Sequence, residues 1–145
     1  MGLLDWLIGE GKKEEESKVS GKILAKPFNI SLSFTPLRLE ANRSNSISLN
    51  INVKNLTSEP QLVSVDVLLP QNAVLGFEQS CINKSIEKRL GEIRAGESAS
   101  VSIPIWGSNQ TKPGEYEVAV TAYAHYIGYD KVLTYAKTKT KFRAV

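Results

Sequence analysis

Hydrophobic and polar residues alternate along most of this chain. The clearest case runs from Glu92 to Tyr126 and predicts two strands joined by a turn between Gly107 and Gly114. In the second strand one face is predicted to carry Tyr116, Val118, Val120, Ala122, Ala124 and Tyr126. A period of two is typical of a half-buried antiparallel strand, because successive side chains leave opposite faces of the sheet. His125 occupies an intervening position near the end of this strand and is therefore predicted to face solvent.

The same alternation recurs in other segments, with irregular stretches between them. Further strands are predicted at residues 28–34, 47–53, 63–69, 86–93 and 132–142. Pro27 and Pro36 bracket the first of these and make it an outer strand, since proline cannot donate to a ladder. The segment from Arg38 to Asn45 resembles a turn. Without alternating helices, the pattern predicts an all-β domain over residues 19–145, a single antiparallel β-sandwich of seven to eight strands.

Residues 1–18 have a different character. On a helical wheel Leu3, Leu4, Leu7 and Ile8 form one apolar stripe with Trp6 at its edge, so a short amphipathic helix is predicted, followed by a charged linker. This stripe is a candidate for docking on a membrane or a partner. The alternative is a terminal helix that packs on its own sandwich or frays, because so short a helix is marginal alone in water.

Composition narrows the class of protein. The 145 residues suit one domain, and the net charge of +3 does not indicate a nucleic-acid partner. The single cysteine, Cys81, excludes an intrachain disulfide. We find neither a secretory signal nor an apolar run long enough to cross a bilayer. The expected location is the cytoplasm, with the membrane surface as an alternative.

Five asparagines begin an Asn-x-Ser/Thr sequence, the acceptor motif for N-glycosylation: Asn29, Asn42, Asn55, Asn83 and Asn109. A glycosylated, exported domain is one interpretation. The other is that a turn-rich β protein with many Ser and Thr residues generates such motifs by composition. Without an export signal, we favour the second interpretation.

Two segments resemble a known family. Ile47–Pro70 is similar to the strand–loop–strand unit of the bacterial and archaeal immunoglobulin-like modules of the CARDB and NEW3 type. Leu90–Tyr123 resembles their later half, with a Gly-Glu turn at Gly96 and a Pro-Gly-x-Tyr strand entry at Pro113. The resemblance implies an immunoglobulin-like sandwich and an adhesion-type or accessory binding module.

Few residues are suited to catalysis or to binding a metal ion. Cys81 and His125 are the only candidates for a nucleophile and its base, and one Cys with one His provides no zinc-ligand spacing. We therefore expect no enzyme, no metal and no cofactor.

A basic stripe is the most informative polar feature. It consists of Lys137, Lys139, Lys141 and Arg143, which leave one face of the last strand. It is a candidate contact for an anionic partner. Alternatively, lysines on an edge strand discourage aggregation, and Glu115 and Glu117 on a neighbouring strand neutralise them. Trp106, at a strand end, is a candidate loop contact or a residue at the mouth of the core.

The leading functional hypothesis is a non-enzymatic interaction module that binds a protein partner or self-associates. The alternative is a peripheral membrane module that uses the N-terminal stripe and the basic strand. A carbohydrate-binding domain is less favoured, because only Tyr123, Tyr135 and Trp106 offer exposed aromatic rings.

Overall fold

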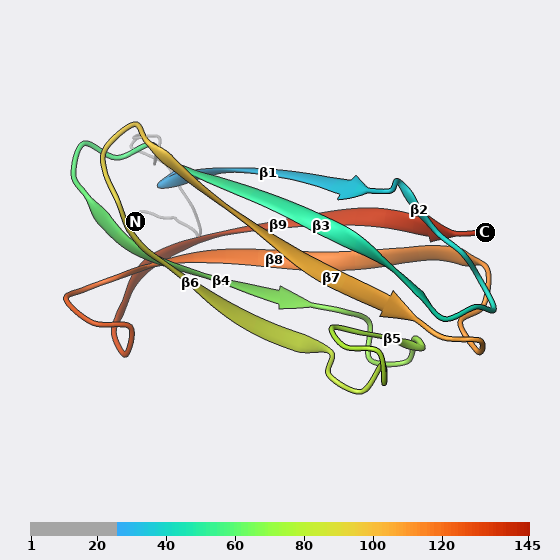
Figure 1. Ribbon diagram of the computed structural model, residues 1–145. Coiled ribbons are helices and arrows are strands. Elements are labelled where there is room, and N and C mark those ends of the chain that lie inside the picture. The colour runs from blue at the N-terminus through green and yellow to red at the C-terminus, as the bar shows by residue number, and fades with distance from the viewer. Residues whose placement is uncertain (1–25) are drawn as a thin grey trace, which may run out of the picture.

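The computed structural model describes residues 26–145, which form two packed β-sheets (Figure 1). The four-stranded sheet has the order β1-β3-β7-β5, and its strands are β1 (Phe28–Thr35), β3 (Asn45–Asn55), β7 (Ser98–Gly107) and β5 (Leu75–Gly76). The five-stranded sheet has the order β2-β9-β8-β4-β6. Its strands are β2 (Arg38–Leu39), β9 (Val132–Ala144), β8 (Gly114–His125), β4 (Gln61–Leu68) and β6 (Ser85–Ile93). The predicted all-β sandwich is confirmed.

The core lies between the two sheets and follows from the alternation in the sequence. In β3 every second residue from Ile47 to Val53 is buried, and the exposed or half-buried residues between them are polar. The central strands contribute most of the fully buried aliphatic side chains: Ile47, Leu49, Ile51, Val53, Val63, Val65, Val67, Ile103, Ile105, Val118 and Val120. Burying each such side chain contributes about 1.5–3 kcal/mol.

Three details differ from the sequence-based predictions. The described residues contain nine strands, because the two-residue strands β2 and β5 were not predicted. The predicted turn after Arg38 begins with β2, whose Leu39 is fully buried. β2 pairs with β9 in parallel, so the sandwich is antiparallel only in its longer strands. The predicted N-terminal helix and linker of residues 1–18 lie outside the described residues.

The two ends of the sandwich carry different connections. The β8–β9 connection, residues 126–131, projects from one end (left in Figure 1), which is also the end where β1 begins. The C-terminus, β2 and β5 lie toward the other end. No helix within residues 26–145 is long and apolar enough to span a membrane.

Candidate functional site

The β8–β9 connection is held in a defined shape by its own backbone. The Tyr126 amide donates to the Lys131 carbonyl at 3.0 Å, and the Gly128 amide donates to the Tyr126 carbonyl at 2.7 Å. A third bond runs from the Lys131 amide to the Gly128 carbonyl at 3.3 Å. The connection is therefore a closed hairpin, fixed to the ends of β8 and β9.

His125 anchors this hairpin to the sheet, and the prediction that it faces solvent is wrong. It leaves the outer face of β8, as its position in the alternation requires, yet only 6% of it is exposed. Its Nδ1 lies 3.2 Å from the Lys131 carbonyl, and its Nε2 lies 2.7 Å from Ser64 Oγ. The hairpin folds back over the ring, which the alternation pattern cannot register.

Tyr129 provides a second anchor. Its ring packs edge-on against His125, with centroids 5.1 Å apart, and Arg89 stacks on it at 4.7 Å. The Gly91 amide donates to the Tyr129 hydroxyl at 3.0 Å. Gly91 has a φ of 79° and lies beside an irregularity in the β4–β6 ladder, so its amide is available to a side chain. Tyr129 therefore ties the hairpin to the edge strand β6.

The anchored hairpin presents apolar side chains to solvent. The connection and the first residues of β9 together carry five of the eleven large exposed hydrophobic residues in the described part of the chain. We call these five the hairpin surface: Tyr126, Ile127, Val132, Leu133 and Tyr135. Tyr126, assigned by the alternation to the face of Val118 and Val120, is more than half exposed because β8 ends one residue before it. Val132 is exposed because a register shift between β8 and β9 places it opposite His125, on the outer face.

Ile127 is the most exposed of these residues, at 84%, and has a φ of 68°. The left-handed region is sterically costly for a β-branched residue, by about 1–2 kcal/mol. The Ile127 side chain is not buried against the described residues, so no gain from burial offsets this cost. Such strain at an exposed apolar residue is typical of a contact site, where the conformation serves binding.

A shallow depression of about 390 Å³ adjoins the hairpin surface on the outer face of the five-stranded sheet. Asp66 and Glu87 lie opposite each other across β4 and β6 at one side of it, and Tyr123 and Tyr129 at the other. Burial raises the pKa of Asp66, and the charge of Glu87 raises it further, while His125 has the opposite influence.

The Ser64–His125 pair has the spacing of a nucleophile and its base. Ser64 borders the depression, but it is only 1% exposed and its hydroxyl is bonded to His125, so it is almost closed to solvent. The other candidate nucleophile, Cys81, lies beside Gly76 of β5, whereas His125 is the last residue of β8, which finishes at the opposite end of the sandwich from β5 (Figure 1). Burial raises the pKa of the Cys81 thiol, which disfavours the reactive thiolate. The geometry therefore favours structural roles for Ser64, His125 and Cys81.

The basic stripe lies where the sequence places it. All four of its residues are exposed on the outer face of β9. Opposite them on β8, Glu115 faces Arg143 and Glu117 faces Lys141, and the Lys141 Nζ lies 3.7 Å from a Glu115 oxygen. Lys141 thus forms an ion pair with β8, as one of the two interpretations expects, and Arg143 has an acidic neighbour there. Lys137 and Lys139 face Thr121 and Ala119.

Trp106 lies near the end of β7, as the sequence predicts, but not at the mouth of the core. It is half-buried on the outer face of the four-stranded sheet, between Ser46 of β3 and Gly76 of β5. Its carbonyl accepts the Cys81 thiol at 3.4 Å. Tyr123 and Tyr135 belong to the other sheet, so the three aromatic residues do not form one surface. Leu3, Leu4, Trp6, Leu7 and Ile8 lie outside the described residues.

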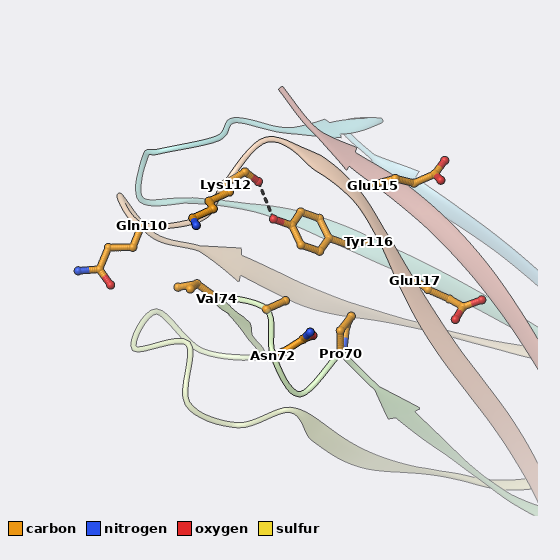
Figure 2. Close-up of a pocket in the computed structure, with 9 residues that line it drawn as sticks. Pro70, Asn72, Val74, Gln110, Lys112, Glu115, Tyr116 and Glu117 are labelled. Atoms are coloured by element: carbon orange, nitrogen blue, oxygen red, sulfur yellow. Dashed lines mark hydrogen bonds between the residues drawn. The ribbon is translucent and has the colours of Figure 1, made fainter.

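A cleft of about 490 Å³ lies at the opposite end, between the β4–β5 loop and the β7–β8 connection (Figure 2). The Tyr116 ring points into it, and its hydroxyl donates to the Lys112 carbonyl at 2.5 Å. Glu115 and Glu117 point away from it in Figure 2. Within residues 26–145 no group of three or more His, Cys, Asp or Glu residues is placed to hold a metal ion.

Sequence reasoning missed the hairpin surface, although a signal for it is present. The segment Tyr-Ile-Gly-Tyr-Asp at residues 126–130 places an aliphatic residue in a turn, where polar residues are usual.

No known family model and no curated protein matches this chain. Among solved structures, the fold is similar to a Salmonella alpha-2-macroglobulin mutant, with a TM-score of 0.58 and 17% identity over 85% of this chain and 7% of that one. It is similar to Escherichia coli alpha-2-macroglobulin from domain MG7 to the C-terminus, with a TM-score of 0.53 and 17% identity over 81% of this chain and 17% of that one.

A FixG-related protein from Vibrio parahaemolyticus has a TM-score of 0.51 and 11% identity over 83% of this chain and 98% of that one. The chain spans only 7–17% of the two macroglobulins. At these identities the similarity defines the fold, a β-sandwich domain.

Proposed function

We propose that this chain is a non-enzymatic interaction module with an immunoglobulin-like sandwich, and that it binds a protein partner through the hairpin surface. The gathering of five exposed hydrophobic residues at one hairpin carries the proposal. Contiguous exposed apolar side chains on a folded domain usually mark a binding surface. The resemblance of Ile47–Pro70 to immunoglobulin-like modules supports the finer class of fold.

The anchoring of the hairpin supports the same proposal. His125 and Tyr129 hold the connection to β4 and β6, so the apolar side chains do not depend on a partner for their position. A preorganised surface loses less conformational entropy on binding than a mobile loop does. Tyrosine adds contact area together with a polar tip, which suits an interface that is exposed before the partner arrives.

Contact with an anionic membrane is the second candidate. Lys131 and Lys137 are exposed beside the hairpin surface, and tyrosines with lysines around an apolar tip suit the lipid–water boundary. Lys26 lines a cleft together with Tyr135 and Lys137 and adds a third exposed lysine near this surface. Binding of sugar is less favoured, because the rings of Tyr123 and Tyr135 are inclined at 45° and do not form a flat platform.

Site-specific photo-cross-linking in cells of the source organism tests the proposal. A photoreactive amino acid replaces Tyr126 in one protein and Ile82, which is 72% exposed near the other end, in the control. We expect a discrete protein adduct from position 126 only, and we expect Leu133→Ser to abolish it. Equal adducts from both positions, or no adduct from position 126, would overturn the proposal.

Sedimentation with vesicles separates the two candidates. If the full chain pellets with anionic but not neutral vesicles, and Leu133→Ser prevents this, the hairpin surface contacts lipid. If the cross-link forms and no vesicle is bound, the partner is a protein.

A further inference from the structure

One edge of β9 is open over most of its length within the described part of the chain. β8 pairs with β9 from Val132 to Ala144, but on the other edge β2 reaches only Arg143 and Ala144. Alternate backbone amides and carbonyls of the preceding residues therefore point away from the sheet. Such an edge is a template for an added strand, whose main-chain hydrogen bonds provide affinity.

The outer face of this edge favours an added strand with acidic side chains. A strand added beside β9 would place every second side chain opposite Lys137, Lys139 and Lys141. β8, on the other edge, offers an example inside the molecule, because its Glu117 faces Lys141. Lys137 and Lys139 have neutral neighbours on β8, and no carboxylate of the described residues forms an ion pair with either. Acidic side chains on an added strand would complement them.

The inner face of this edge favours an added strand with small side chains. A cleft of about 300 Å³ separates the start of β1 from the middle of β9, and its walls include Phe28, Ile30, Ala136 and Thr138. The inward residues of β9 are small and half-buried here. Small apolar side chains at the intervening positions of an added strand fit this cleft.

We propose that the open edge of β9 binds an extended segment of a partner protein in which acidic residues alternate with small apolar residues. This site is separate from the hairpin surface and does not depend on it. A second copy of β9 does not fit, because its lysines would lie opposite these lysines, and like charges directly opposite are destabilising. The same lysines thus oppose pairing with basic strands and favour acidic ones.

The test uses the full chain and a fluorescent peptide that contains Glu-Val-Glu-Val-Glu-Val-Glu, with binding measured by fluorescence anisotropy. We expect saturable binding that the double variant Lys137→Glu, Lys139→Glu weakens by about tenfold or more. The matched control, Lys54→Glu with Lys88→Glu, reverses two exposed lysines on β3 and β6 and should leave the affinity unchanged. Ile127→Asn should also leave it unchanged, so failure here and failure of the hairpin proposal are distinguishable.

Two further peptides make the test specific to strand addition. A peptide with Lys in place of Glu should bind the double variant better than the original chain. A peptide N-methylated at alternate residues loses backbone donors and should not bind. Equal binding of the methylated peptide, or an equal loss in the Lys54 and Lys88 control, would reduce the effect to general charge attraction and overturn the proposal. Amides 133–141 already protected from hydrogen exchange on their open edge in the free full chain would also overturn it.

Discussion

Ser64 Oγ lies 2.7 Å from Nε2 of His125, and this hydrogen bond joins β4 to the last residue of β8. On the other side of the ring, Nδ1 faces the Lys131 carbonyl at 3.2 Å. Because a carbonyl can only accept, Nδ1 carries a proton, and in the neutral ring Ser64 donates to Nε2. The imidazole thus links the sheet to the hairpin that carries the exposed apolar residues.

Replacing Ser64 with Ala should lower the free energy of unfolding by about 1–2 kcal/mol, because it leaves a buried ring nitrogen without a donor. Urea denaturation measures this loss. The control is Ser31→Ala on the exposed face of β1, which should change the value by less than about 0.5 kcal/mol. A loss no larger than the control's would show that Ser64 does not hold His125.

Asn55 should be far more sensitive to substitution than Asn29, although both begin a glycosylation motif. The Asn55 side chain is fully buried; it donates to the carbonyls of Glu59 and Ile93 and accepts two hydrogen bonds from Thr57. Asn55→Ala should cost about 3 kcal/mol or more, because it leaves several buried groups unpaired. Asn29→Ala, on the exposed face of β1, should be nearly neutral. Equal effects in thermal unfolding would contradict the assigned role of Asn55.

Replacing Asp66 with Asn should stabilise the protein at neutral pH but not at low pH. The pKa of Asp66 is raised in the folded state, chiefly by burial and then by Glu87, so the folded state binds its proton more tightly than the unfolded state. Stability from this group is present at low pH and is lost as pH rises from the unfolded pKa through the folded one. The gain at pH 7 should stay below about 1 kcal/mol, because the carboxylate is partly exposed.

Urea denaturation of the Asp66→Asn protein at pH 3 and pH 7 provides the comparison. Only the difference between the stability changes measured at pH 3 and at pH 7 bears on the pKa of Asp66, because a change in packing would alter the stability at both pH values. A gain of the same size at both would show that the shifted pKa is not its cause.

The alternation of residues predicted the sandwich because period-two burial dominates its long strands. In β3, β7 and β8 most residues that the pattern assigned to the core are buried. β2 could not be predicted in this way, because two residues contain no period. Leu39 is buried through a parallel pairing with β9, more than a hundred residues later in the chain.

The candidate site was less accessible to sequence reasoning. The pattern assigned His125 to the correct face of β8, but it could not indicate that Tyr129 and the hairpin cover that face. The basic stripe was predicted from spacing alone and is exposed as expected. The ion pair of Lys141 and the neutral neighbours of Lys137 and Lys139 depend on the register with β8, which the sequence does not specify.

Ile127→Asn should leave the protein at least as stable and is expected to raise the free energy of unfolding by about 0.5–1 kcal/mol. Asn tolerates positive φ, whereas a β-branched residue does not, and the Ile127 side chain is almost fully exposed. Denaturant unfolding measures the change. A loss of more than about 1 kcal/mol would mean that Ile127 contributes to folding and is not strained for binding.

The most direct measurement is the photo-cross-link from position 126 in a chain that also carries Ile127→Asn, compared with the same chain carrying Ile127. Circular dichroism and the urea midpoint of both proteins establish that the fold is kept. The account predicts an intact sandwich and loss of the protein adduct. An intact sandwich with an undiminished adduct would contradict the claim that the hairpin surface is where this module binds its partner.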